Sequence, residues 1–244
     1  MAQERLDMLV AARGLAESRE QARRLILAGA ILVDGHALCK AGLRVPDTVE
    51  IVCKAAPRFV GRGGEKLDAA FEAFGLNVAG CVCLDVGAST GGFTDCLLQH
   101  GAARVYAVDV GRAQLHDRLR RDPRVVVMDG VNARHLAPAD LPETPSFAVL
   151  DVSFISLTKV LPAVTAILQP GSQGVALIKP QFEAGRRQVQ RGGVVRDPAV
   201  REEVVQSVTR FAAAELGLAI RGVCPSPLKG PAGNVEFLFW FAKP

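Results

Sequence analysis

The sequence predicts an α/β protein with two parts: a small N-terminal α/β domain and a larger domain built on a doubly wound, seven-stranded sheet. From residue 80 onward, short apolar runs alternate with helix-length segments, the pattern of a parallel sheet with helices on both faces. The first 53 residues instead contain two short amphipathic stretches followed by short strand-like runs. With 244 residues, 49% of them hydrophobic, the chain is long enough for a core in each part.

Composition and patterning exclude several other classes of protein. Charged residues make up 22% of the chain, which is not the balance of a disordered, collagen-like or coiled-coil protein. The longest apolar stretches, such as Leu25–Val33, are too short and too interrupted to span a bilayer, and the N-terminus has no secretory hydrophobic region. We therefore expect a cytoplasmic protein without stable membrane insertion.

Cysteine and histidine spacing argues against a metal centre. The 6 cysteines include no CxxC pair, and the 4 histidines are scattered along the chain. Two of the cysteines fall on what reads as a buried strand. We expect reduced, mostly buried thiols and no bound metal.

The N-terminal elements follow from periodicity and capping signals. Residues 5–13 place their apolar side chains on one helical face. Ser18, with a glutamine three residues later, is a capping box that begins a second helix, and Gly29 ends it. The Asp34-Gly35 turn then joins two short strands, and residues 49–53 form another.

This N-terminal segment carries the motifs RLDMLV and SREQARRLILAGAILVDG, and it resembles the S4 RNA-binding domain. The resemblance implies that the two-helix face docks on folded RNA. A solvated helix face is the alternative. The arginine bias of the chain, 22 arginines against 7 lysines, suits phosphate binding, but a GC-rich genome would also produce it. The contacts implied by position are Arg5, Arg19, Arg23 and Arg24.

The larger domain reads as five parallel strands and a closing hairpin. The last two apolar runs are separated only by a Pro/Gly-rich turn, too short for a crossover helix, so they are expected to be antiparallel. Seven strands ending in a hairpin are typical of Rossmann-like class I methyltransferases rather than of dehydrogenases. The expected strands are residues 81–87, 104–110, 124–130, 147–153, 174–180, 218–224 and 234–242.

The segment DVGASTGGF after the first strand predicts a cofactor site. Its glycines allow a ligand to approach the backbone at the switch point of the sheet. An acid before the first glycine would repel a pyrophosphate but suits the sulfonium and ammonium groups of S-adenosylmethionine. Asp109 and Asp129 end the next two strands, where they are expected to accept hydrogen bonds from the ribose and the adenine. The expected cofactor-binding residues are Asp85, Gly87, Ser89, Thr90, Gly91, Gly92, Phe93, Asp109, Asp129 and Asp151.

Further motifs extend the resemblance to the whole chain. RGGEKL, LDVSFISL, LIKPQFE and GPAGNVEF, together with the segments above, resemble the TlyA (haemolysin A) family, S4-domain-bearing relatives of the FtsJ-type ribose 2′-O-methyltransferases. The Lys-Asp-Lys-Glu tetrad of the FtsJ-type enzymes falls on Lys66, Asp151, Lys179 and Glu236. One departure is Asp129, where relatives often carry glutamate.

The resemblance implies a substrate and a domain organisation. It implies methylation of cytidine in ribosomal RNA, with ribosomal RNA or ribosomal subunits as partner, and the short ends of this chain favour large-subunit RNA. Only RNA, not DNA, offers the 2′-hydroxyl. The expected boundaries are 1–53 for the S4-like domain, 54–64 for a linker and 65–244 for the FtsJ-like methyltransferase domain.

The tetrad suits the chemistry of a ribose hydroxyl. This group is a very weak acid that loses its proton as it attacks the methyl sulfonium. A lysine can take that proton only if burial or a neighbouring cation lowers its pKa, while carboxylates orient the amines. We expect Lys179 nearest the 2′-hydroxyl, Lys66 on the helix before the sheet, and Asp151 between methyl donor and acceptor. Taken singly, Lys66 or Glu236 could be an ordinary surface or capping charge.

A basic loop over residues 180–198 is expected to close on the RNA, with a solvated mobile loop as the alternative. Asp197 and Pro198 then begin a helix as N-cap and first residue. The RNA-contacting residues expected here are Arg186, Arg187 and Arg191, with Lys229 from the SPLKGPAGN segment.

Two other functions remain open from the sequence. The chain could be a catalytically inactive S4-domain RNA-binding ribosome assembly factor, although the intact tetrad argues against that. It could also be a membrane-active haemolysin, as the family name suggests, although no lytic or membrane-spanning helix is predicted.

Overall fold

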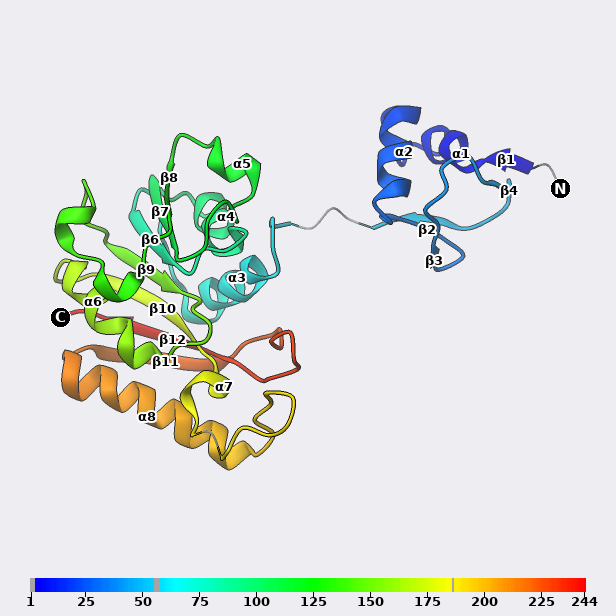
Figure 1. Cartoon of the computed structure of the whole chain (residues 1–244). Coiled ribbons are helices and arrows are strands. Elements are labelled where there is room, and N and C mark those ends of the chain that lie inside the picture. The colour runs from blue at the N-terminus through cyan, green and yellow to red at the C-terminus, as the bar shows by residue number, and fades with distance from the viewer. Residues whose placement is uncertain (1–2, 55–57, 186) are drawn as a thin grey trace. The chain divides into compact units, whose positions relative to one another are not determined.

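The computed structural model describes residues 3–54, 58–185 and 187–244 and divides the chain into two compact units, Met1–Arg58 and Phe59–Pro244 (Figure 1). The expected linker, residues 54–64, spans this division, and its residues 55–57 lie outside the described part. Phe59 is buried in the core of the second unit. The expected domain boundaries stay a prediction.

The N-terminal unit contains the two predicted helices, α1 and α2, and short strands in two sheets. Ser18 caps α2, because its Oγ accepts a hydrogen bond from the Gln21 amide at 3.2 Å, as predicted. The Asp34-Gly35 turn has positive φ at both residues, the conformation of a tight hairpin. The elements are β1 (Gln3–Arg5), α1 (Leu6–Ala12), α2 (Arg19–Leu27), β2 (Ile31–Val33), β3 (His36–Ala37), β4 (Arg44–Pro46) and β5 (Ile51–Cys53).

Strand pairing in this unit is β1 with β4, and β2 between β3 and β5, all antiparallel. The pair β1–β4 was not expected, because three-residue strands carry no readable periodicity. Leu6, Val10, Ala22 and Ile26 are fully buried, and they form the core between the two helices.

A buried carboxylate connects α1 to α2. Asp7 is 2% exposed, and it accepts two hydrogen bonds from Arg5, both at 3.0 Å, and one from Arg19 at 2.9 Å. The hydrogen bonds from Arg5, more than any other cause, lower the pKa of Asp7 to about 2. Two of the four arginines expected to contact RNA therefore also hold the helices of this unit together.

The second unit has a seven-stranded sheet in the order β11-β12-β10-β9-β6-β7-β8. All neighbours are parallel except β12, which lies antiparallel between β10 and β11. The predicted doubly wound sheet and closing hairpin are confirmed. The strands are β6 (Val82–Val86), β7 (Arg104–Asp109), β8 (Val125–Asp129), β9 (Phe147–Leu150), β10 (Gln173–Ile178), β11 (Ala219–Pro225) and β12 (Phe237–Ala242).

Helices cover both faces of this sheet (Figure 1). One core cluster joins the sheet to α3 (Gly63–Phe74), α4 (Gly92–Gln99) and α5 (Asp117–Arg120). The other joins it to α6 (Leu161–Ile167) and α8 (Pro198–Leu216). Asp197 caps α8 through the Ala199 amide at 2.9 Å, as predicted. A short helix, α7 (Pro180–Glu183), follows β10.

The parallel strands bring their carboxyl ends to one edge, where the residues that follow them form the site. Within the part of the chain that the structure describes, no helix combines the length and apolar character needed to cross a membrane.

We expect Asp7→Asn to lower the free energy of unfolding of the N-terminal unit by about 1–3 kcal/mol, since two arginines lose a charged partner. The native pKa of Asp7, about 2, lies below its ordinary value of 3.8. The stability that its carboxylate contributes is therefore complete above pH 3.8 and is lost as the pH falls through about 2. Scanning calorimetry of the full chain across this pH range measures it. The difference in Tm between wild type and variant should shrink toward zero at the acid end.

Asp47→Asn, at an exposed carboxylate of the same unit, is the matched control and should leave the Tm unchanged. A pH-independent difference for Asp7→Asn would show that shape rather than charge is what this carboxylate supplies.

Candidate active site

Asp85, at the end of β6, is a buried carboxylate behind the glycine-rich loop. It is fully buried, and its Oδ2 accepts a hydrogen bond from Thr94 Oγ1 at 2.6 Å, while its Oδ1 has no partner among the described residues. Burial, with smaller contributions from the neighbouring Asp151 and Asp109, raises the pKa of Asp85 to about 7. An unpaired buried oxygen here favours a cationic ligand group nearby.

The loop after β6 tolerates only glycine at its tightest points. Gly87 has a φ of +85°, and a Cβ there would lie 2.6 Å from the carbonyl oxygen of Asp151. Gly91 has a φ of +97°, and a Cβ there would meet Leu119 at 2.2 Å. A Cβ on Gly92 would lie 2.9 Å from the amide nitrogen of Gly64, so the start of α3 packs directly on this loop. The glycines thus let the loop, Asp151 and the start of α3 pack closely around the place where a ligand can bind.

Asp109, at the end of β7, orders the rim of this space. Its Oδ2 accepts a hydrogen bond from the Ser89 amide at 2.8 Å, and its Oδ1 accepts one from the Gly111 amide at 2.7 Å. Asp109 also lines a cavity of about 530 Å³, the main cavity of this unit's site. Its oxygens have lone pairs beyond these two bonds that can accept hydrogen bonds from a ligand.

Asp129, at the end of β8, is paired within the chain, and its expected contact with the adenine stays a prediction. It lies beside Asp109 in the sheet, but its Oδ2 accepts hydrogen bonds from Arg120 at 2.9 and 3.0 Å and from the Ala113 amide at 3.1 Å. It is absent from the lining of the main cavity, which Val131 and Asn132 of the following loop contact instead. In this structure Asp129 pairs with arginine at the strand end.

Two cavities meet at the carboxyl ends of β6 and β9. The larger, about 530 Å³, has a mostly aliphatic wall with a few polar groups; the smaller, about 130 Å³, lies against the start of α3. Gly87, Ser89 and Asp151 line both. Of the expected cofactor residues, those that line one or both are Gly87, Ser89, Thr90, Gly92, Phe93, Asp109 and Asp151. Asp85 and Gly91 lie buried beneath them.

These cavities fit S-adenosylmethionine. Asp85 leaves an unpaired oxygen in a region that also holds Asp109 and Asp151. That concentration of acid suits a molecule with a sulfonium and an ammonium group, whereas it disfavours a pyrophosphate.

The tetrad residues form two ion pairs. Lys66 Nζ lies 2.6 Å from Glu236 Oε2, and Lys179 Nζ lies 2.5 Å from Asp151 Oδ1. Both lysines are 8% exposed, and Glu236 is 1% exposed. Lys179 also donates a hydrogen bond to Ser153 Oγ at 2.9 Å. Each amine therefore has its own carboxylate partner.

Gln181 is hydrogen-bonded to one of these pairs and lies close in sequence to the other. It follows Lys179 by two residues on α7, and its Nε2 donates to Glu236 Oε1 at 3.3 Å. Its Oε1 is buried without a partner among the described residues. At the other side, the start of α3 approaches Asp151, since a Cβ on Gly63 would lie 3.8 Å from Asp151 Oδ2. The structure thus brings the four predicted residues to one place.

Phe154 lines the larger cavity and is not among the residues expected from the sequence. It is 91% exposed on the cavity wall, has a φ of +63°, and lies 5.0 Å from the ring of Phe182. A positive φ is an outlier for a bulky residue, and such strain clusters at functional sites. Only the position of Phe154, three residues after Asp151 in LDVSFISL, could have drawn attention to it.

The residues expected to contact RNA are mostly exposed. Arg23 and Arg24 are exposed on α2, and Arg19 is partly engaged by Asp7. Arg187 and Arg191 are exposed after α7, and Lys229 is exposed before β12. Arg186 lies outside the described residues.

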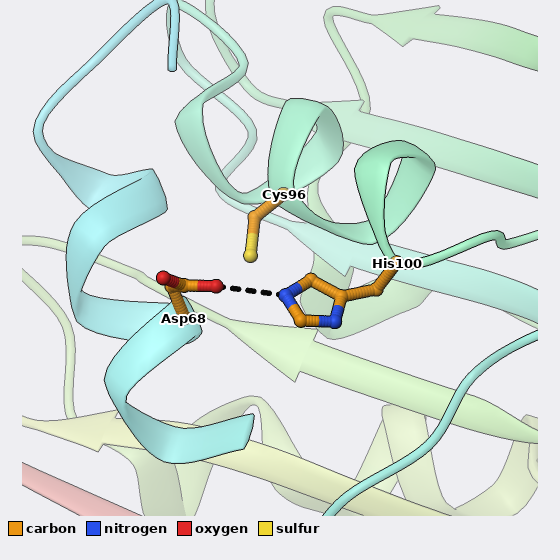
Figure 2. A group of neighbouring side chains, drawn as sticks. All are labelled: Asp68, Cys96 and His100. Atoms are coloured by element: carbon orange, nitrogen blue, oxygen red, sulfur yellow. Dashed lines mark hydrogen bonds and ion pairs between the residues drawn. The ribbon is translucent and has the colours of Figure 1, made fainter. Parts of the chain in front are cut away.

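One group of side chains has the composition of a metal site. The ligand atoms of Asp68, Cys96 and His100 lie within 4.8 Å of one another, between α3 and α4 (Figure 2). His100 Nε2 is 2.8 Å from Asp68 Oδ1, and the His100 ring stacks on Phe71 at 4.3 Å. Cys96 belongs to the apolar core. The contacts of this group join the two helices, and none of its members lines the two cavities.

Known proteins are similar in sequence to this chain over most of its length. The FtsJ-like methyltransferase family matches residues 59–243, and the S4 domain matches residues 4–51. The 16S/23S rRNA (cytidine-2'-O)-methyltransferase TlyA of Mycobacterium tuberculosis is 49% identical, over 97% of this chain and 88% of that protein. Hemolysin A of Brachyspira hyodysenteriae is 44% identical, over 97% and 99%. The 23S rRNA (cytidine-2'-O)-methyltransferase TlyA of Campylobacter jejuni is 32% identical, over 76% and 71%.

Solved structures agree. A Streptococcus thermophilus protein, provisionally named a hemolysin, is 46% identical with a TM-score of 0.77 and covers 100% of this chain and 89% of its own. The N-methyltransferase NodS of Bradyrhizobium japonicum, in complex with S-adenosyl-L-homocysteine, shares the fold alone, at 16% identity and a TM-score of 0.52 over 75% of this chain and 86% of that one. With an S4 domain, an FtsJ-like methyltransferase domain and close relatives along its length, the chain belongs to the TlyA family of S-adenosylmethionine-dependent methyltransferases.

Proposed function

We propose that this enzyme transfers a methyl group from S-adenosylmethionine to the ribose 2′-oxygen of cytidine in ribosomal RNA. The observation that carries the proposal is the pair of buried lysine–carboxylate contacts, Lys66–Glu236 and Lys179–Asp151, because Asp151 of the second pair lines both cavities. A ribose hydroxyl must lose a proton during transfer, so its enzyme needs groups that bind and move protons beside the methyl donor.

The names of the relatives support ribosomal RNA as the substrate. One relative acts on 16S and 23S rRNA and another on 23S rRNA, both at cytidine. Large-subunit RNA is the substrate that the two names share, so it is the one we propose for this chain. Mapping of 2′-O-methyl groups in both ribosomal RNAs, from cells with and without the gene, tests the choice. A ribosomal substrate places the enzyme's work in the cytoplasm.

We propose the following roles for the chain's own residues. Asp109 holds the ribose hydroxyls of the cofactor, and the glycine loop with Asp85 accommodates its charged end. When bound, S-adenosylmethionine supplies a methyl group activated by the adjacent sulfonium. Asp151 lies on both cavities and anchors Lys179, so these two residues face donor and acceptor. The amine of Lys179 takes the proton of the 2′-hydroxyl. The Lys66–Glu236 ion pair supplies fixed charges beside it.

RNA docking is proposed to use exposed cations of both units. Arg23 and Arg24 on α2 are the exposed arginines best placed on the S4 helix face, since Arg5 and Arg19 also pair with Asp7. In the methyltransferase unit, Arg187, Arg191 and Lys229 are exposed near the segments that hold the tetrad. The hydroxyl acceptor makes RNA, not DNA, the partner.

Two relatives carry the name hemolysin, which keeps membrane lysis as a second candidate. Leakage from liposomes incubated with the purified protein separates it from methyl transfer. An inactive assembly factor is the third candidate, and the formed ion pairs of the tetrad disfavour it.

Asp109→Ala should weaken S-adenosylmethionine binding by about 1.5–3 kcal/mol, or roughly ten- to a hundredfold, because ligand hydrogen bonds to a carboxylate are removed. The Ser89 and Gly111 amides would also lose their acceptor. Calorimetric titration measures the change. Asp122→Ala removes a carboxylate that similarly caps a turn and binds Arg124 away from both cavities, and it should leave affinity unaltered. Equal affinities for wild type and Asp109→Ala would refute the assignment.

Lys179→Arg should keep the fold and the cofactor affinity but slow methyl transfer by about 10²–10⁴-fold, the usual contribution of acid–base catalysis, because arginine does not release its proton. Lys66→Arg should be milder if that residue acts through charge alone. Single-turnover transfer to ribosomal RNA across a pH series measures both, with Lys159→Arg, an exposed lysine, as control. A native rate in Lys179→Arg would show that fixed charge suffices and that another group takes the proton.

Replacement of both Arg23 and Arg24 by Glu should weaken RNA binding and reduce the slope of log affinity against log salt by roughly 0.7–0.9 for each phosphate that is no longer neutralised. Cofactor affinity should not change, because the site lies in the other unit. Arg121→Glu with Arg210→Glu, two exposed arginines of the second unit, provides a charge-matched control. An equal decrease in both double variants would mean that overall charge, and not the S4 face, governs binding.

A further inference from the structure

Asn234 is a buried polar residue that the tetrad does not explain. It precedes Glu236 by two residues in GPAGNVEF and is 1% exposed. Its Oδ1 accepts a hydrogen bond from the Val195 amide at 2.9 Å, and its Nδ2 donates one to the Gly193 carbonyl at 2.8 Å. Its own carbonyl accepts a hydrogen bond from the Gly230 amide at 2.9 Å. The side chain thus binds the backbone of a segment about 40 residues away in sequence.

The segment that Asn234 holds is the part of the predicted 180–198 loop that spans residues 187–196, called the basic loop from this point. The loop turns back on itself through a bridge between Gln190 and Val194, and Gly192 and Gly193 have positive φ. Val195 is fully buried, and its carbonyl accepts a hydrogen bond from Arg201 of α8 at 2.9 Å. The far end of the loop is therefore fixed to the core, and Asn234 fixes the turn beside it.

The other segment that Asn234 organises is residues 229–236. Gly230 lies against Glu236, since a Cβ there would be 2.5 Å from Glu236 Oε1. Lys229, next to Gly230, is exposed, as are Arg187 and Arg191 of the basic loop. Because Asn234 contacts both segments, it ties the backbone that carries Arg191 to the backbone that runs from Lys229 to Glu236.

We propose that Asn234 is a positioning residue that fastens the basic loop to the Glu236 segment, so that Arg187, Arg191 and Lys229 form one preset edge for the phosphates of the RNA substrate. The inference rests on the proposed function and adds to it the element that orders the RNA-binding loop. Ordering the loop in the free enzyme removes an entropy cost that binding would otherwise include.

Only asparagine satisfies both backbone groups here. A carboxylate accepts from the Val195 amide but cannot donate to the Gly193 carbonyl, and alanine leaves both groups without a partner. Since each is a neutral hydrogen bond, removing both should open the loop without unfolding the domain. Asn234→Ala removes both bonds, whereas Asn234→Asp keeps the acceptor but turns a buried carboxylate oxygen toward the Gly193 carbonyl, so both variants should open the loop.

The first measurement is hydrogen exchange of the full chain. In Asn234→Ala, amide exchange over residues 187–195 should be roughly tenfold faster, because two hydrogen bonds are removed, while the sheet strands keep their protection. Asn77→Ala is the matched control: this exposed asparagine caps the turn at Ala79 far from both segments, and its replacement should not affect the loop. Unchanged exchange over residues 187–195 in Asn234→Ala overturns the proposal, whatever the enzyme's substrate.

The second measurement separates positioning from general damage. For methylation of ribosomal RNA, Asn234→Ala should raise KM for the RNA about tenfold and flatten its salt dependence, with kcat within about threefold of wild type and unchanged cofactor affinity. Asn234→Asp should raise KM in the same direction. Faster exchange with an unchanged KM would show that the loop is fastened but does not bind RNA, which also overturns the proposal. Absence of RNA methylation in the wild type would refute the proposed function and leave the exchange result as the test of the fastening.

Discussion

The close approach of two backbones, at Gly87 after β6 and Asp151 after β9, is the constraint on which the rest of this enzyme depends. A Cβ on Gly87 would lie 2.6 Å from the Asp151 carbonyl oxygen, so no side chain fits between the two strand ends. This contact sets Asp151 against the glycine loop, and the two cavities share both residues. Gly92 meets the start of α3 in the same way, which brings Lys66 to the site.

Acidic groups concentrated at these strand ends have an energetic consequence. Burial and the neighbouring Asp109 and Asp151 raise the pKa of Asp85 to about 7, and one of its oxygens lacks a partner among the described residues. Such a site is costly in the free protein and is compensated when a cationic ligand enters. Cofactor binding should therefore stabilise the second unit by more than its contacts alone suggest, since it also relieves repulsion among the carboxylates.

The two buried lysines each lie against one carboxylate. Lys66 pairs with Glu236, and Lys179 pairs with Asp151. Asp151 of the Lys179–Asp151 pair lines the larger cavity, so a ligand that enters this cavity competes with Lys179 for the carboxylate. Gln181 of α7 donates a hydrogen bond to Glu236, and Asn234, two residues before Glu236, binds the backbone of the basic loop at Val195. The four tetrad residues thus lie among neighbours from several elements, an arrangement that restricts their side chains.

The sequence by itself determined the fold class, the strand ends with their acids, and the helix caps at Ser18 and Asp197, because periodicity and capping are local properties. It indicated the tetrad residues only through resemblance, and their catalytic role stays a prediction. It missed the β1–β4 pair, since three residues carry no period. Only the tertiary structure decided which charges meet: Arg5 and Arg19 on Asp7, Arg120 on Asp129, and each lysine on its own carboxylate. It also exposed Phe154 and buried Asn234, because burial and partner choice depend on packing between segments distant in sequence.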